Sequence, residues 1–207
     1  ISAGYGSSLT SIFKGVVIKH GIKLDGDNFS RLIVQCKDNA VAMTVGRKNA
    51  NFVDMKDSDI ISQLVGAYSG LSSDVTATNT SYKELVQYYC TDWDFILTRA
   101  EANGFLVTAD AGKVSVKAPQ VESEPVLTLT YGIDLISFGA DVDATAQFSV
   151  VKGFAWNPTD QAIQEVQAGP NQLTGQGDLA ADTLAGVIAP NYFRLQTSVP
   201  LDNSTLT

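Results

Sequence analysis

The chain has 207 residues, of which 44% are hydrophobic and 17% are charged, a composition typical of a folded protein with a substantial core rather than a disordered chain. Fourteen basic and 22 acidic residues give a net charge of −8. This balance argues against nonspecific nucleic-acid binding, which needs an excess of Lys and Arg. No apolar run approaches the length of about 18 residues that a membrane-spanning helix needs, so we expect no direct membrane span.

The charge is unevenly distributed along the chain. Residues 1–52 carry a net charge of +4, whereas residues 53–207 carry a net charge of −12. A chain with a basic and an acidic end suits head-to-tail docking between subunits. An ordinary solvated surface with no particular partner explains the same distribution equally well.

The first fifty residues contain three runs rich in β-branched residues, which predict strands. These runs are 12–19, 31–36 and 40–45. An Asp-Gly turn signal within 24–28 separates the first two runs, because glycine tolerates a positive φ. Three short strands at this spacing predict part of an antiparallel barrel or sandwich.

The hydrophobic period then becomes helical. Apolar residues at helical spacing predict a first helix at about 57–69, with Asp57 or Ser58 as its N-cap. Gly70 follows the last periodic position and is expected to end this helix.

A second, longer helix is predicted at about 82–103. Ser81 and Glu84 have the spacing of a capping box, in which each side chain bonds the other residue's backbone N–H. Gly104 follows as a C-terminal glycine. The apolar residues expected on one face are Leu85, Tyr89, Trp93, Ile96 and Ala100.

The remaining predicted elements are mostly strands. Residues 105–109 and 113–117 flank Asp110-Ala111-Gly112 and predict a hairpin. Further short strands are expected at 74–77, 126–131, 135–138 and 147–156, a loop at 169–178 and a weakly helical stretch at 180–188.

Catalytic and metal-binding motifs are sparse. His20 is the single histidine, so a two-histidine metal site is excluded, and no nucleophile elbow accompanies it to suggest a Ser-His-Asp triad. Cys36 and Cys90, the two cysteines, are expected to be small buried hydrophobes. A disulfide between them stays an open alternative.

Two groups of acidic residues are candidate sites. Asp92 and Asp94 flank Trp93 on the predicted helix and point in different directions, which disfavours the converging carboxylates of a glycosidase. A calcium site is an alternative for the second group, but turn aspartates that bond their own backbone are more common. That second group is Asp134, Asp141 and Asp143.

The segment from Ser81 to Gly104 resembles part of the VgrG proteins. The shared features are a Gln-Tyr pair, an acidic-Trp-Asp-Phe core, an Arg-Ala-Glu run and a glycine before a strand. Phe13-Lys14-Gly15-Val16-Val17 is similar to the family's F-x-G-x-V strand, and residues 57–64 lie where the family has a short helix. The resemblance covers residues 1–150.

VgrG is the trimeric spike hub of type VI secretion systems and is related in fold to the baseplate hubs of contractile phage tails. The resemblance implies an α+β, mainly antiparallel β fold with two small β-barrel-like domains of the phage baseplate hub type and the two connecting helices. The implied division is 1–52 for part of a first barrel, 53–120 for the helical segment and hairpin of a second, and 121–207 for further hub strands and a loop-rich end. The chain lacks the family's N-terminal strands and needle domain, so we expect an internal fragment.

The implied function is structural. Three copies of the full-length protein would form a ring that joins a hexameric tube protein to a needle or spike domain and contacts baseplate proteins. Assembly would occur in the bacterial cytoplasm, before injection at the apparatus tip or incorporation into a virion baseplate. No enzymatic activity, cofactor, metal or nucleic-acid partner is expected. The alternative function is a carbohydrate- or surface-binding β module, for which exposed aromatic side chains beside a groove would be the signature.

The residues that carry the resemblance are candidates for packing roles, and three basic residues are candidates for an interface. The packing candidates are Phe13, Gly15, Tyr89, Trp93, Asp94, Phe95, Arg99, Glu101 and Gly104. The interface candidates are Lys37, Arg47 and Lys48.

Overall fold

The computed structural model describes residues 1–24, 26, 29–120, 123–169, 179–190, 192–197, 201 and 206. The chain divides into two compact units, Ile1–Pro119 and Gln120–Thr207. No helix among these residues has the length and apolarity needed to cross a lipid bilayer.

The first unit begins with two small antiparallel pairs of strands. Strands β1 (Ser2–Ala3) and β2 (Thr10–Ser11) pair with each other, and β3 (Val16–Leu24) pairs with β4 (Ser30–Lys37). The β3–β4 register shifts between Val17 and Lys19, which places a bulge at this point. A short 3₁₀ helix, η1 (Asn39–Thr44), follows β4.

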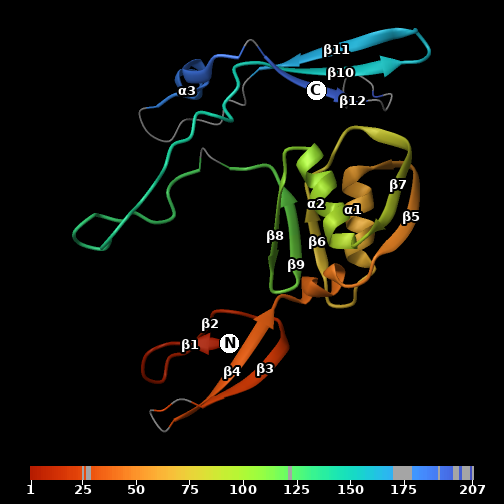
Figure 1. Ribbon diagram of the computed structural model, residues 1–207. Coiled ribbons are helices and arrows are strands. Elements are labelled where there is room, and N and C mark those ends of the chain that lie inside the picture. Colours follow the sequence, from red (N-terminus) through yellow and green to blue (C-terminus); the bar gives the residue numbers. More distant parts are fainter. Residues whose placement is uncertain are drawn as a thin grey trace. The chain divides into compact units, whose positions relative to one another are not determined.

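The rest of the first unit contains two helices and five strands (Figure 1). Strand β5 (Lys48–Lys56) pairs antiparallel with β7 (Ser81–Cys90). Strand β9 (Lys113–Lys117) lies between β6 (Ser72–Val75), to which it is parallel, and β8 (Leu106–Asp110), to which it is antiparallel. The helices are α1 (Asp57–Gly66) and α2 (Asp92–Ala102), which lie against each other.

The core forms where the two helices meet the two sheets. Helix α1 contacts β5 and β6, and α2 contacts β7 and β8. Ile60, Val65 and Ile96 are completely buried, and the Phe52 and Phe95 rings stack with centroids 5.7 Å apart. Buried aliphatic side chains of this size each contribute about 1.5–3 kcal/mol to the free energy of unfolding. The helices are therefore held chiefly by tertiary packing.

The second unit has one small sheet and one short helix. Strand β10 (Val151–Asn157) lies between β11 (Ala162–Ala168), antiparallel to it, and β12 (Phe193–Thr197), parallel to it. Helix α3 (Ala181–Ile188) precedes β12. Its position confirms the expected weak helical stretch at 180–188.

The long helix predicted over 82–103 is wrong in its first half. Residues 81–90 form strand β7, and the helix begins only at Asp92. The N-cap is Thr91, whose hydroxyl accepts the Asp94 backbone N–H at 3.0 Å. The predicted capping box at Ser81 and Glu84 does not form, because pairing with β5 holds both residues in extended backbone.

Several other local predictions also differ from the structure. The strand expected at 40–45 is the 3₁₀ helix η1, with Asp38 as its N-cap. Helix α1 ends at Gly66 rather than near 69, and Gly70 (φ +80°) lies in the following turn instead of ending the helix. No strand forms at 126–131 or 135–138, where Tyr131 and Leu135 make one isolated bridge.

The remaining local predictions agree in part or fully. Both strands of the hairpin predicted at 105–117 are present, and β3, β4, β6 and β10 overlap predicted strands. The sequence did not predict β5, β11 or β12. The turn expected at 24–28 lies mostly outside the described residues, as does the loop expected at 169–178 beyond Gly169.

The coarse fold class is confirmed. The protein is α+β with mostly antiparallel sheets. Among the described residues these sheets have two or three strands, and none closes into a barrel.

Candidate functional site

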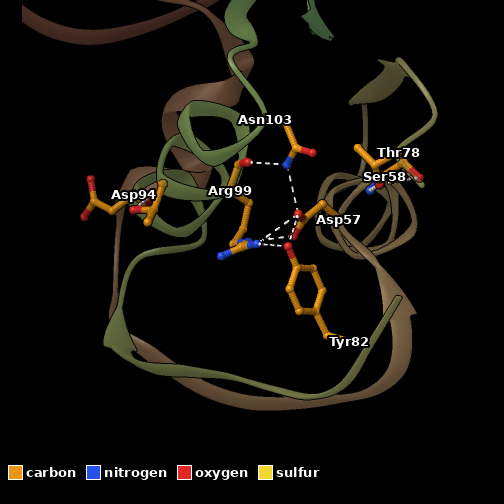
Figure 2. A network of polar contacts seen from close by, with 8 residues as sticks. Asp57, Ser58, Thr78, Tyr82, Asp94, Arg99 and Asn103 are labelled. Atoms are coloured by element: carbon orange, nitrogen blue, oxygen red, sulfur yellow. Dashed lines mark hydrogen bonds and ion pairs between the residues drawn. The ribbon is translucent and has the colours of Figure 1, made fainter. Parts of the chain in front are cut away.

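The first residue of helix α1 is a fully buried carboxylate with four hydrogen bonds (Figure 2). The Arg99 guanidinium of α2 donates to both oxygens of Asp57, from Nε at 2.6 Å and from an Nη at 2.9 Å. The Asn103 amide donates at 2.8 Å, and the Tyr82 hydroxyl of β7 lies 3.2 Å from the same carboxylate. Asp57 thus connects α1, α2 and β7 at one point.

The partners of Asp57 are also bonded to one another. The Arg99 guanidinium donates to the Tyr82 hydroxyl oxygen at 2.8 Å and lies over the Tyr82 ring, 4.9 Å from its centroid. Burial raises the pKa of Tyr82, so this hydroxyl stays protonated near neutral pH. Burial lowers the pKa of Arg99, but its hydrogen bonds with Asp57 raise this pKa by a larger amount. The pKa of Arg99 therefore lies above its ordinary value.

The first residue of helix α2 is a second fully buried carboxylate, Asp92. The Lys48 ammonium of β5 and the Tyr68 hydroxyl each donate to its Oδ2 at 2.6 Å. The Gln87 amide of β7 donates to its Oδ1 at 2.9 Å. The Lys48 ammonium also lies 4.7 Å from the centroid of the Tyr68 ring.

The charge states in this second network are fixed by hydrogen bonds. Burial raises the pKa of Asp92, but the hydrogen bonds from Gln87, Lys48 and Tyr68 together lower it by more. The pKa of Asp92 therefore lies below its ordinary value. The hydrogen bond to Asp92 raises the pKa of Lys48. Both groups are therefore ionised near neutral pH.

The two networks share a design. Each carboxylate opens a helix, where the partial positive charge of the helix N-terminus favours an anion. Each is bonded to a cation, a tyrosine and an amide from other elements. Because these donors occupy the carboxylate oxygens, the arrangement is suited to fixing the helices against the strands rather than to accepting a substrate proton.

An apolar pocket of about 250 Å³ lies beside η1, between β4, α2 and β8. Its polar residues are Lys37, Asp38 and Thr44. The Asp38 carboxylate accepts the backbone N–H groups of Ala40, at 2.8 Å, and Gly112, at 3.0 Å. It therefore holds the backbone around the pocket.

Four of the packing candidates contribute directly to the first unit. Arg99 belongs to the Asp57 network, Phe95 stacks on Phe52, and Trp93 is half-buried against the core. A Cβ at Gly15 would lie 2.2 Å from the Lys37 carbonyl oxygen, so only glycine permits this close approach.

The other packing candidates lie at or near the surface. Phe13 is half-buried, whereas Asp94 and Glu101 are exposed. Gly104 has φ +65° in the turn after α2. Tyr89 is 60% exposed and has φ +45°; its backbone N–H donates to the Asn49 side chain at 2.8 Å.

The structure separates the three interface candidates. Lys37 is exposed beside the apolar pocket. Arg47 is exposed and lies 5.1 Å from the centroid of the Tyr89 ring. Lys48 has an internal partner, the buried Asp92.

The structure does not bring the other weighed residues together as a site. His20 is exposed, and Cys36 and Cys90 are free, half-buried thiols. Asp92 is buried, whereas Asp94 is exposed on the same helix. No group of three or more His, Cys, Asp or Glu side chains that could hold a metal occurs within the part of the chain that the structure describes.

Sequence reasoning missed the buried networks themselves. It placed Asp57 only as a possible N-cap and did not pair either carboxylate with Tyr68, Tyr82 or Gln87. The one available signal was an aspartate at the first position of each helix, and the partners lie between 5 and 46 residues away along the chain.

Comparisons place this architecture among known proteins. Residues 1–207 match the family model described as the Alg8 N-terminal domain, and the chain belongs to this family. No curated protein matches the sequence.

Two solved structures share the fold. The tail protein from Neisseria meningitidis MC58 aligns with 94% of this chain at a TM-score of 0.60 and 14% identity. The 43 kDa tail protein of prophage MuSo2 from Shewanella oneidensis aligns with 89% at a TM-score of 0.56 and 12% identity. This chain covers only 57% and 52% of their respective lengths. The fold of this chain is therefore that of phage tail proteins.

Proposed function

We propose that this chain is part of the structural hub of a contractile injection apparatus, of the VgrG or phage baseplate hub type. Three copies of the full-length protein form a ring that joins the inner tube to the needle. The observation that carries this proposal is the fold shared with two tail proteins along nearly the whole chain. The resemblance of residues 1–150 to VgrG supports the hub role within the tail.

The open sheets support a role in assembly. The described strands form sheets of two or three strands, and isolated two-stranded sheets are marginally stable in water. We propose that the two hub β-barrels are completed by contacts outside this chain, either with the rest of the full-length protein or with neighbouring copies.

The charge distribution supports contacts between unlike surfaces. The basic residues 1–52 and the acidic remainder suit a head-to-tail contact. Such a contact generates a ring when the rotation that repeats it closes, which the proposed trimer requires. Lys37 and Arg47 are exposed and available for this contact, whereas Lys48 is bonded internally to Asp92. We assign the basic side of the contact to Lys37 and Arg47.

The proposal includes no catalytic step and no cofactor. The fully buried acids Asp57 and Asp92 are both bonded to cations and hold the helices in place. The partners of the hub are then proteins: the hexameric tube, the needle or spike domain and the baseplate. Nucleic acid is not among them. The hub assembles in the bacterial cytoplasm and leaves it at the apparatus tip, or becomes part of a virion baseplate.

A carbohydrate- or surface-binding module is a second candidate, and one observation favours it. Tyr88 and Tyr89, consecutive residues of β7, are 81% and 60% exposed, and exposed aromatic rings stack on sugars. Trp93 argues the other way, because its side chain packs against the core.

The test is the solution mass of the full-length protein, measured by light scattering alone and mixed with its tube protein. A trimer that binds the tube hexamer is the expected result. Lys37→Glu with Arg47→Glu should weaken this complex, and Lys83→Glu, an exposed reversal on β7, is the matched control. The second candidate would be favoured if the protein were a monomer that does not bind the tube protein but does bind glycans on an array. Tyr88→Ala should then abolish the glycan binding.

A further inference from the structure

The β3–β4 ribbon has one apolar and one basic face. Successive residues of a strand point to opposite faces, and the pairing register settles which residues share each face. We define the apolar ribbon face by Val17, Ile22, Leu24, Leu32 and Val34. His20, Ser30 and Cys36 lie on the same face. We define the basic ribbon face as Lys19, Lys23, Arg31 and Lys37, which also carries Val16, Gly21, Ile33 and Gln35.

The apolar ribbon face is left uncovered. Ile22, Leu24 and Leu32 are each at least 70% exposed, although they lie side by side on one ribbon. Contiguous exposed apolar surface on a strand pair marks an interaction site. Within the described residues, β3 and β4 have only each other as strand partners, so the outer edge of each lacks a neighbouring strand.

A second segment also exposes apolar side chains, and its charge is opposite to that of the basic ribbon face. Residues 123–147 contain no Lys or Arg and carry Glu124, Asp134, Asp141 and Asp143. Leu127, Leu129 and Tyr131 occupy alternate positions in a stretch without regular secondary structure and are 51–76% exposed. The six residues from Val126 to Tyr131 span about 20 Å as a strand, which fits within the roughly 27 Å of an eight-residue strand such as β4.

The alternation of this stretch matches the two faces of the ribbon. If Leu127, Leu129 and Tyr131 continue the apolar ribbon face, then Val126, Thr128 and Thr130 continue the basic ribbon face, and Glu124 joins them when the added strand extends back to residue 124. A carboxylate then lies beside lysines and arginine, and apolar side chains lie beside apolar ones.

We propose that residues 126–131 of one copy add as a strand to the edge of the β3–β4 ribbon of a neighbouring copy. Backbone hydrogen bonds supply the attraction, and the matched faces set the register. After the turn at Gly132, Ile136 and Phe138 supply further apolar side chains to cover the apolar ribbon face. The inference rests on the proposed ring and adds this strand to its head-to-tail contact.

Cysteine cross-linking between two variants tests this contact in the full-length protein. With Cys36→Ser and Cys90→Ser in every variant, one sample carries Ile22→Cys (or Leu32→Cys, for the other edge) and a second carries Leu129→Cys. We expect a disulfide-linked pair only when the two samples are assembled together. Val86→Cys, at an exposed apolar position on β7 (54% exposed), is the matched control and should form no link with Leu129→Cys.

The outcomes separate this inference from the proposed function. Failure of both edge variants to link to Leu129→Cys, in a protein that still binds its tube, overturns the contact and leaves the hub role intact. Linking without tube binding supports the contact and removes the hub role. In the double variants Ile22→Cys/Leu129→Cys and Leu32→Cys/Leu129→Cys, a link confined to single chains would show that the segment covers its own ribbon, which also overturns the inference.

Charge reversal supplies an independent readout. Glu124→Lys should reduce the rate of cross-linking about two- to fivefold, as expected for one exposed ion pair. Combining Glu124→Lys on one copy with Lys19→Glu (or Lys37→Glu, for the β4 edge) on the other should restore the rate. An unchanged rate in Glu124→Lys would contradict the placement of Glu124 beside the basic ribbon face.

Discussion

The helix-containing core at residues 48–117 and the β3–β4 ribbon at 16–37 have similar proportions of β-branched residues, but their apolar side chains differ in burial. In the core, Ile60 and Ile96 are completely buried, whereas in the ribbon Ile22 is 73% exposed. The difference lies in what covers the strands: α1 and α2 pack against β5, β6, β7 and β8, and the apolar ribbon face has no such cover. The comparison teaches that helices of the first unit cover the core strands, whereas among the described residues of that unit no helix covers the ribbon.

Breaking the Asp57 network should have the largest effect on the stability of the core. Arg99→Met removes the cation and leaves the buried Asp57 carboxylate without its charge partner, which we expect to cost about 3–5 kcal/mol of unfolding free energy. Urea unfolding followed by the fluorescence of Trp93, in a Trp156→Phe background, measures this. Glu101→Gln, at an exposed position on the same helix, should change the stability by less than about 0.5 kcal/mol.

Asp92→Asn should have the next largest effect and a distinctive pH dependence. Loss of charged hydrogen bonds is expected to cost about 1.5–3 kcal/mol at pH 7. The pKa of Asp92 in the folded state is below its ordinary value. The ionised carboxylate therefore contributes fully to the free energy of unfolding above the unfolded-state pKa of about 3.9, and this contribution is lost as the pH falls through the folded-state pKa.

The pH dependence provides the check on that prediction. The stability difference between the original protein and Asp92→Asn, measured by urea unfolding at several pH values, should shrink below about pH 4. A difference that stayed constant down to pH 2 would show that the Asp92 charge does not stabilise the fold.

Removing the N-cap of α2 tests where this helix begins. Thr91→Ala loses the hydroxyl that accepts the Asp94 N–H and should cost about 1 kcal/mol. Ser81→Ala is the matched control, since Ser81 lies in β7 and caps no helix. Equal losses in the two variants, measured by thermal unfolding, would contradict the position of the helix start.

The smallest effect is expected in the ribbon. Ile22→Ala removes an exposed side chain and should change the unfolding free energy of the isolated monomer by less than about 0.5 kcal/mol. The equivalent change in the core, Ile60→Ala, should cost about 2–5 kcal/mol. Chemical unfolding at low protein concentration measures both. A large loss in Ile22→Ala would mean that the ribbon is covered within one chain.

The sequence predicted the elements whose signals are local. The hairpin formed by β8 and β9 follows from two β-rich runs around a glycine turn, and α1 follows from its helical period with acidic residues at its start. The mainly antiparallel α+β class was also predicted. The resemblance to VgrG pointed to a phage-tail fold, and two solved tail proteins confirm that fold.

The candidate site was less accessible to sequence reasoning. Arg99 was named for its place in a family motif, but its partner Asp57 lies 42 residues away, and nothing local pairs them. Gly15 was named in the same way, and the structure supplies the reason, which is the closeness of the Lys37 carbonyl.

Residues 81–94 show where local pattern ends and tertiary structure begins. Ser81-x-x-Glu84 and Thr91-x-x-Asp94 both fit the start of a helix, so the sequence determined that a helix lies in this region and which apolar residues it carries. Tertiary structure decided which start is used. Pairing with β5 holds residues 81–90 extended, where Gln87 reaches Asp92, and the helix can begin only after that pairing ends. Backbone hydrogen bonds to a distant strand thereby outweighed the local capping signal at Ser81 and Glu84.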